Sequence, residues 1–190
     1  ELDMPNISNR GFGMPSSPIR KLAPLAAKAR ARGLKIYQLN IGQPDIPTPQ
    51  KALDALKNVD RQVLEYSPSQ GILSLREALV QYYERYQIKL APDDVIVTAG
   101  GSEAVLFAFM SCLDPGDEII VTDPSYANYM AFAISCGAVV KSVKTHIEDG
   151  FKLPPVEEFE KQITDKTRAI LICNPNNPTG YLYTKQEMRQ

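Results

Sequence analysis

The sequence is poor in residues that bind metals or form disulfides, with one histidine and three cysteines among 190 residues. Cys112, Cys136 and Cys173 are too far apart for a metal or redox pair, and each has apolar neighbours. We interpret them as small core residues of a protein from a reducing compartment, and favour a buried thiol at Cys173 over a reactive one. His146 lies in a polar link and is expected to be exposed or structural. We therefore expect no metal site.

Long apolar runs and an excess of one charge are also absent. No run reaches the ~20 residues that a membrane span requires, and no secretory signal pattern is present. With 21 basic and 22 acidic residues, the chain has no excess of positive charge to attract nucleic acid or a membrane surface. We expect a cytoplasmic globular protein that binds neither nucleic acid nor membrane.

Apolar runs and helical periodicity alternate along most of the chain. They predict strands at residues 36–42, 95–98, 118–122, 138–143 and 169–173, and helices at 17–33, 49–58, 75–82, 102–112, 126–136 and 155–163, with a further helix from Thr184. Residues 1–16 show little periodicity and are expected to form an extended arm. Strands that alternate with helices predict an α/β fold with a largely parallel sheet flanked by helices.

The most informative segment follows the last predicted strand, where an apolar run ends in Asn174–Gly180 (NPNNPTG). Two X-Pro bonds stiffen this segment and favour extended geometry at each preceding Asn. Such a segment holds an amide side chain at the carboxyl end of a strand, where ligands bind in open α/β sheets. Taken alone, it is equally compatible with a Pro-rich surface loop.

Two further strand ends carry residues of interest. Gly100 and Gly101 separate a strand from a helix, and the free N–H groups at a helix start favour a phosphate. The segment matches neither G-x-G-x-x-G nor G-x-x-x-x-G-K-[ST], so nucleotide binding is disfavoured. Tyr126 and Tyr129 follow the strand at 118–122 and could stack on a planar ring. By themselves, the two tyrosines are better explained by packing of their helix on the sheet.

Together, these strand ends offer backbone N–H groups for a phosphate, an aromatic ring for stacking and a rigidly held amide. These features suit pyridoxal phosphate. At these residues the chain resembles the fold type I pyridoxal-phosphate aminotransferases of class I/II, the aspartate aminotransferase-like group. The resemblance covers nearly the whole chain. It rests on five motifs in the family's order: Leu39–Asp45 (LNIGQPD), Tyr66–Gly71 (YSPSQG), Asp114–Asp117 (DPGD), Asp123–Tyr126 (DPSY) and Asn174–Gly180.

The resemblance implies roles for five residues at the cofactor. Gly101, Ser102 and Glu103 match the loop whose backbone amides hold the phosphate. Tyr126 matches the aromatic residue that stacks on the pyridine ring, where relatives also carry Trp or Phe. Asn177 matches the amide that hydrogen-bonds the phenolic oxygen of the ring, and it also faces the substrate.

The resemblance further implies a homodimer with shared sites. Tyr66 matches a tyrosine that reaches the phosphate of the partner subunit, and Gly42 falls in the loop that covers the substrate. Residues 1–47 are expected to form an arm and part of a small domain, and residues 48–190 the first half of the large cofactor-binding domain. The family's Schiff-base lysine is expected beyond Gln190, so no catalytic residue is assigned here and the segment alone is expected to be inert.

The implied activity is transfer of an amino group between an amino acid and a 2-oxo acid, whose identities the sequence does not specify. Two alternatives stay open. One is the ligand-sensing, aminotransferase-like domain of a regulator, which the neutral charge balance and the lack of a helix-turn-helix before Ser17 disfavour. The other is a different fold type I pyridoxal-phosphate enzyme, such as a lyase or a decarboxylase.

Overall fold

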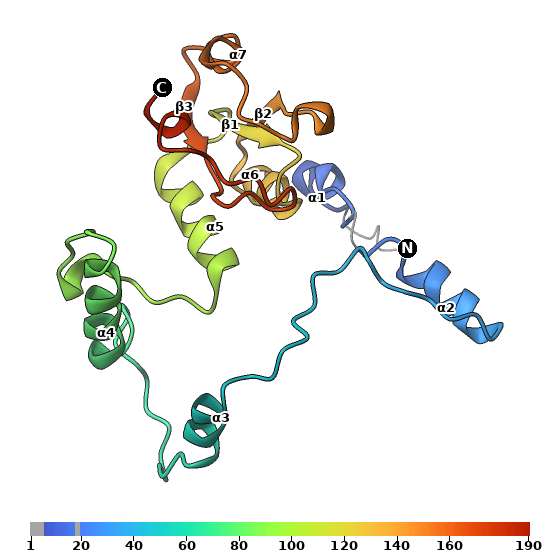
Figure 1. The fold of residues 1–190 in the computed structure, drawn as a ribbon. Coiled ribbons are helices and arrows are strands. Elements are labelled where there is room, and N and C mark those ends of the chain that lie inside the picture. Colours follow the sequence, from blue (N-terminus) through green and yellow to red (C-terminus); the bar gives the residue numbers. More distant parts are fainter. Residues whose placement is uncertain (1–5, 18–19) are drawn as a thin grey trace. The chain divides into compact units, whose positions relative to one another are not determined.

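The computed structural model describes residues 6–17 and 20–190. These residues divide into two units, whose helices and strands are labelled in Figure 1. The sheet unit comprises residues 6–17 and 99–190, and the helical unit comprises residues 20–98. The domain boundary expected between residues 47 and 48 stays a prediction.

The sheet unit is built on three parallel strands, β1 (Glu118–Asp123), β2 (Val139–Lys144) and β3 (Thr167–Leu171), in the order β2-β1-β3. Ile119 of the central strand lies opposite Val140 of β2 and Ala169 of β3. The first five residues of β1 are buried, because both edges of the strand are paired and both faces are covered. The predicted parallel α/β sheet is therefore confirmed.

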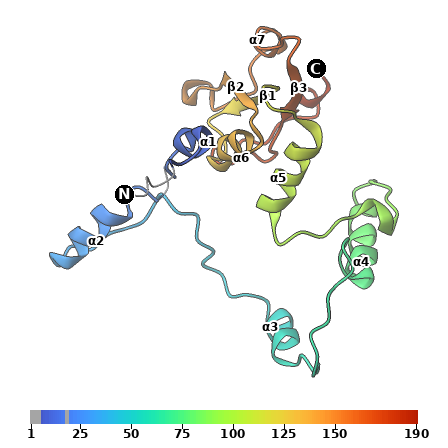
Figure 2. The ribbon, with the colours of Figure 1, turned by 180° about the vertical axis from the view of Figure 1, so that it is seen from behind.

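Helices cover both faces of this sheet, as Figures 1 and 2 show. α5 (Gly101–Cys112) and α6 (Asn128–Cys136) pack on one face, and α7 (Val156–Glu160) packs on the other. Successive residues of β1 point to opposite faces, so Ile119 joins the core under α5 and α6 while Ile120 joins Phe159 of α7. The remaining elements of the unit are α1 (Asn9–Gly13), which contacts α6, and the 3₁₀ helices η2 (Ile147–Asp149) and η3 (Glu187–Arg189).

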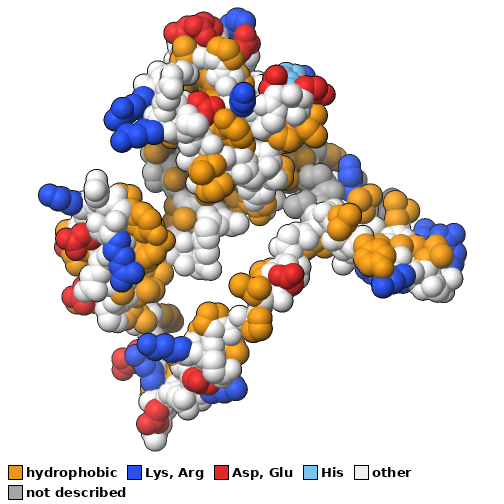
Figure 3. All heavy atoms as spheres, viewed as in Figure 1, with side chains coloured by type: hydrophobic (Ala, Val, Ile, Leu, Met, Phe, Trp, Pro, Cys, Tyr) orange, Lys and Arg blue, Asp and Glu red, His pale blue; other side chains and the backbone are white. Residues whose placement is uncertain are grey.

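The helical unit contains α2 (Ala23–Ala31), α3 (Gln50–Lys57), α4 (Leu73–Glu84) and the 3₁₀ helix η1 (Pro92–Asp94). Among residues 20–98, only Arg76 and Val95 are buried. Hydrophobic side chains therefore lie on the surface of this unit, and Figure 3 shows them along α2 and α4. The elements form where the sequence predicts helices, but few of their apolar faces are covered within the unit.

One packed spot in the helical unit joins α4 to η1. The guanidinium of Arg76 donates to the carbonyl oxygens of Gly71 (3.3 Å) and Pro92 (2.8 Å) and pairs with Asp93 (3.2 Å). Gly71 has a φ of +100°, and a Cβ there would lie 2.6 Å from Cβ of Val97. Only glycine fits this turn, because any side chain would meet both a strained backbone and a close neighbour.

Five sequence predictions of secondary structure are wrong. The arm expected to be extended contains the helix α1. Residues 36–42 and 95–98 form no strand; in the second segment, the N–H of Val97 donates to Gln70 O instead of joining a ladder. The helix expected from Thr184 is reduced to the single 3₁₀ turn η3. The helix expected from residue 17 begins at Ala23, because Pro24 is tolerated in a first turn but not in a helix interior. Its expected start at Pro18 lies outside the described residues.

The cysteines differ from the expectation of a uniformly buried set. Cys112 is exposed at the end of α5, so its interpretation as a core residue is wrong, whereas Cys136 and Cys173 are partly buried. His146 is exposed, as expected.

Within residues 6–17 and 20–190, no group of His, Cys, Asp and Glu side chains is placed to hold a metal ion. In the same ranges, no helix has the length and apolar character needed to cross a membrane.

Candidate functional site

The parallel sheet brings two of the predicted site segments to one edge. β1 and β3 are hydrogen-bonded neighbours that run in the same direction, and they end at Asp123 and Leu171. Tyr126 follows the first of these ends and Asn177 the second. Because carboxyl ends of parallel strands meet at one edge, both residues lie at the edge where ligands bind in such sheets.

The start of α5 lies toward the same edge. α5 ends at Cys112, and a short link, residues 113–117, returns the chain to the beginning of β1. The helix therefore runs antiparallel to the strand it covers, and its 12 residues extend about 18 Å toward the carboxyl edge. Gly101, at its N-terminus, is thus directed to the side where Tyr126 and Asn177 lie.

The first turn of α5 has an open, donor-rich backbone. No side chain caps this helix, and the N–H groups of Gly101 and Ser102 donate to no group in the described part of the chain. A Cβ built at Gly100 or at Gly101 would meet no atom within 4 Å, so open space lies beside this backbone. An anion could therefore approach these amides closely.

The side chain of Glu103 bonds the backbone just before α5. Its carboxylate turns back and accepts a hydrogen bond from the N–H of Ala99 at 2.6 Å, and its own N–H donates to Gly100 O at 3.1 Å. The donors that face open space are therefore those of Gly101 and Ser102. The carboxylate of Glu103 is held by its hydrogen bond to Ala99, and the role of the Glu103 amide at a phosphate stays a prediction.

Tyr126 is half-buried and fixed from two sides. Its hydroxyl accepts a hydrogen bond from the side-chain amide of Asn128 at 2.7 Å. Its ring meets the ring of Tyr129 edge-on, with centroids 5.4 Å apart and planes at 85°. Burial, together with a hydrogen bond to the Cys173 thiol, raises the pKa of Tyr129 to about 12. Tyr129 thus packs inward and supports the ring of Tyr126 in one orientation.

The Asn-rich segment exposes one amide and buries the next. Asn174–Pro175 and Asn177–Pro178 are cis peptide bonds. Between them, Asn176 is buried, and its backbone closes a tight turn by accepting from Gly180 N and donating to Tyr181 O, both at 2.8 Å. Asn177 is exposed at the turn's surface, where its amide is accessible to a ligand. The motif resemblance singled out Asn177, whereas the buried role of the adjacent Asn176 was not predicted.

A hollow of about 430 Å³ lies beside Tyr126. It is lined by residues 14–17 of the N-terminal arm and by residues between Asp123 and Ala131. The arm therefore contributes to the surroundings of Tyr126, although the sequence predicted only an extended segment there.

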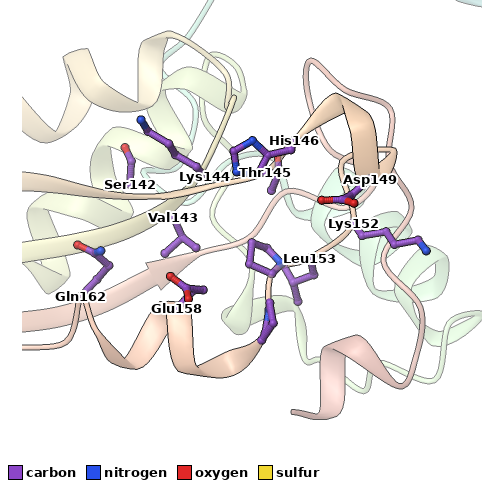
Figure 4. Close-up of a pocket in the computed structure, with 12 residues that line it drawn as sticks. Ser142, Val143, Lys144, Thr145, His146, Asp149, Lys152, Leu153, Glu158 and Gln162 are labelled. Carbon is purple, nitrogen blue, oxygen red and sulfur yellow. The ribbon is translucent and has the colours of Figure 1, made fainter.

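A second hollow, of about 640 Å³, lies at the β2 side of the sheet. Figure 4 shows that its lining comes from β2, from the link after it and from the α7 region. It contains Lys144, His146 and Lys152, but none of the residues that the sequence predicted for the site. Although this hollow is larger than the one beside Tyr126, we do not assign it to the predicted site, because none of the predicted residues lines it.

The two remaining predicted residues lie in the helical unit. Tyr66 is fully exposed, and Gly42 is exposed as well. Their predicted roles, at the phosphate of a partner subunit and over the substrate, stay predictions.

Comparisons with known proteins give the family. Residues 35–190 match the family Aminotransferase class I and II. The aspartate aminotransferase of Thermotoga maritima is 39% identical over 174 residues, which are 89% of this chain and 46% of that protein. The aspartate/prephenate aminotransferase of Thermus thermophilus is 36% identical over 185 residues, 96% of this chain and 48% of that protein.

A solved structure agrees with these sequence matches. The alanine aminotransferase of Pyrococcus furiosus has a TM-score of 0.90 and 35% identity, with 97% of this chain and 48% of that chain covered. The chain belongs to the class I and II aminotransferase family. It spans about half the length of the relatives it matches, and it corresponds to their N-terminal portion. The family resemblance in the motifs is thereby confirmed.

Proposed function

We propose that this chain is the N-terminal half of a pyridoxal-phosphate-dependent aminotransferase that moves an amino group between an amino acid and a 2-oxo acid. The observation that carries the proposal is the convergence of three features at one sheet edge. These are the uncapped start of α5, the braced ring of Tyr126 and the exposed amide of Asn177. Membership of the aminotransferase family supports the reaction class.

The residues present fit the cofactor. The open space beside Gly100 and Gly101 suits close approach of a phosphate to the amides of Gly101 and Ser102. The ring of Tyr126 offers a flat apolar face at the same edge, and Asn177 offers an amide donor. Each group needed to hold a flat, phosphorylated, oxygen-bearing ring is therefore available in the sheet unit.

Bound pyridoxal phosphate supplies an electron-withdrawing ring that stabilises the negative charge formed when a proton leaves Cα of the amino acid. The residues of this chain orient that ring. The amides at the start of α5 bind the phosphate with the positive end of the helix dipole. Tyr126 fixes the ring plane, and the Asn177 amide donates to the phenolic oxygen and thereby favours its negative charge. No lysine of this chain is assigned to the bond with the cofactor.

The substrates and assembly belong to the same proposal. Relatives are named for aspartate, for aspartate and prephenate, and for alanine, so the amino acid is left open. Gly42 would lie in the loop over the substrate, and Tyr66 would reach the phosphate of the second subunit in a cytoplasmic homodimer. Full exposure of the Tyr66 side chain in the helical unit is consistent with a partner outside the chain.

The test uses the full-length protein incubated with pyridoxal phosphate, reduced with borohydride and weighed intact. We expect one reduced adduct per chain on a single lysine outside residues 1–190, and none when reduction precedes cofactor addition. A full-length protein that gains no adduct would reject the assignment.

A second assay separates the reaction classes. Purified holoenzyme mixed with aspartate or alanine should release one equivalent of 2-oxo acid per site, without CO₂ or ammonia. Release of CO₂ would indicate a decarboxylase, and release of ammonia a lyase.

A further inference from the structure

Three polar side chains are buried together beneath the Asn-rich turn. Thr122 of β1, Asn176 and Tyr183 have exposed fractions of 2%, 7% and 5%. The side-chain amide nitrogen of Asn176 donates to Tyr183 Oη at 3.1 Å and to Thr122 Oγ1 at 3.3 Å. The two hydroxyl oxygens lie 3.4 Å apart, so one donates to the other. The three groups therefore form a closed ring of hydrogen bonds.

The donors and acceptors of Asn176 match its surroundings in only one orientation. Its amide nitrogen lies within hydrogen-bond distance of both hydroxyl oxygens, and its Oδ1 accepts from Thr179 N at 3.4 Å. A flipped amide would place its NH₂ group against the N–H of Thr179, where two donors would oppose each other. Among the described residues, no buried side-chain nitrogen or oxygen is left without a partner. The orientation of the amide is thus determined by the network.

This network joins the two strand ends that carry the candidate site. Thr122 lies four residues before Tyr126, and Asn176 directly precedes Asn177. Tyr183 is tied to the turn a second time, because its N–H donates to Asn174 Oδ1 at 3.0 Å. The sheet pairs β1 with β3 only as far as Val121 and Leu171, so beyond these residues the ladder no longer sets the spacing of the two loops. The Asn176 network spans that gap.

We propose that Asn176, held by Thr122 and Tyr183, is a positioning residue that fixes the amide of Asn177 relative to the ring of Tyr126. The inference rests on the proposed function, since it assigns a purpose to the network at a cofactor site. Three apolar side chains in place of Thr122, Asn176 and Tyr183 could fill the same space, but they would leave the turn free to shift along the strand end. Buried hydrogen bonds are directional, so a fully satisfied network specifies a single arrangement.

The experiment uses the full-length holoenzyme and conservative variants that each remove one hydroxyl. Thr122→Val and Tyr183→Phe delete one acceptor of the Asn176 amide, while Thr122→Ser keeps the hydroxyl and should restore parent behaviour. Tyr181→Phe is the matched control, because the Tyr181 hydroxyl bonds Glu187 at 2.9 Å and does not contact the Asn176 side chain. Asn177→Ala provides the reference for full loss of the positioned amide.

Three readouts are compared across these variants: the pH midpoint of the absorbance change of bound cofactor, kcat and KM, and hydrogen exchange of residues 174–180 in the cofactor-free protein. For Thr122→Val and Tyr183→Phe, we expect the midpoint to move in the direction of Asn177→Ala, by on the order of half a pH unit. We expect kcat to fall about tenfold with KM little changed, as small misplacements do. Exchange of the turn should be faster before any cofactor is added.

Each outcome decides between two explanations. If Asn177→Ala shifts the absorbance midpoint but Thr122→Val and Tyr183→Phe behave like Tyr181→Phe, the positioning role is wrong and the proposed function stands. A lower melting temperature with unchanged absorbance would make the network merely structural. If the parent protein binds no pyridoxal phosphate, the proposed function fails and the positioning role fails with it. If one variant does not fold, the other still gives the comparison.

Discussion

The sheet unit and the helical unit both form most of the helices expected of them, but they bury their side chains to different extents. In the sheet unit, residues from α5, α6, α7 and the strands form two core clusters around β1. In residues 20–98, only Arg76 and Val95 are buried, although α3 and α4 carry apolar side chains. Helices form from local pattern and propensity, whereas burial requires partners distant in sequence. In the sheet unit, the strands and helices that carry the candidate cofactor residues are packed against other parts of the same chain.

The largest expected effect compares one core residue with one exposed residue. Ile120 is fully buried in β1, whereas Leu56 of α3 is 74% exposed. In the 190-residue chain, Ile120→Ala should lower the free energy of unfolding by about 2–5 kcal/mol through lost burial and a cavity. Leu56→Ala should change it by at most about 0.5 kcal/mol. Urea unfolding followed by circular dichroism measures both.

The same pair in the full-length protein tests what covers the helical unit. A cost for Leu56→Ala that rises toward that for Ile120→Ala would show that α3 is covered there. Equal costs in the 190-residue chain would contradict the difference between the units.

The next effect compares two adjacent asparagines of the sheet unit. Asn176→Ala removes a buried amide and leaves Thr122, Tyr183 and the N–H of Thr179 short of partners. We expect a loss of about 1–3 kcal/mol in the free energy of unfolding. Asn177→Ala, at an exposed position, should cost at most about 0.5 kcal/mol. Similar losses of stability in melting experiments on both variants would contradict the assignment of a structural role to Asn176 and not to Asn177.

A smaller effect is expected at the packed spot of the helical unit. Arg76→Met keeps an apolar stem but removes the donors to Gly71 O and Pro92 O. It should destabilise the α4–η1 region by about 1–2 kcal/mol, because two carbonyl groups lose a charged partner. Asp93→Asn should have little effect, since Asp93 is 90% exposed and its ion pair is screened by water. Hydrogen exchange of residues 71–97 distinguishes the two variants, and equal protection in Arg76→Met and the parent would contradict the assignment.

The smallest effect concerns the acid stability of the sheet unit. The Thr164 hydroxyl donates to the Glu118 carboxylate at 2.8 Å, and this hydrogen bond, with the nearby Lys141, lowers the pKa of Glu118 despite its burial. A lowered pKa stabilises the folded state above the ordinary carboxyl pKa, and that stability is lost as the pH falls. Glu118→Gln should therefore flatten the fall in melting temperature from about pH 5 downward, as the pH passes through the lowered pKa. A fall as steep as in the parent would show that Glu118 does not contribute.

Much of the sheet unit could be predicted from the sequence, because its elements follow local patterns. The alternation of apolar runs and helical periodicity placed β1, α5, α6, β2 and β3 within a few residues of their observed bounds. The failures occurred where local pattern competes with other forces. Pro24 delays the start of α2, and Val97 bonds Gln70 instead of a neighbouring strand.

The residues of the candidate site could be predicted from the sequence, but the buried hydrogen bonds that hold them in place could not. Motif resemblance pointed to Gly101, Tyr126 and Asn177, because these residue types suit a phosphate, a ring and a phenolic oxygen. The motif gave no role to the neighbouring Asn176, because its burial depends on which amide faces the strand end. Thr122 and Tyr183 are 61 residues apart in sequence, and only the fold brings their hydroxyls together.

We propose that the sheet edge carrying Tyr126 and Asn177 positions the cofactor. A crystal structure of the full-length protein with pyridoxal phosphate tests it most directly. We expect the phosphate at the start of α5, the ring against Tyr126, and the Asn177 amide about 2.9 Å from the phenolic oxygen. Cofactor bound elsewhere, such as in the hollow beside Lys144 and Lys152, would contradict it.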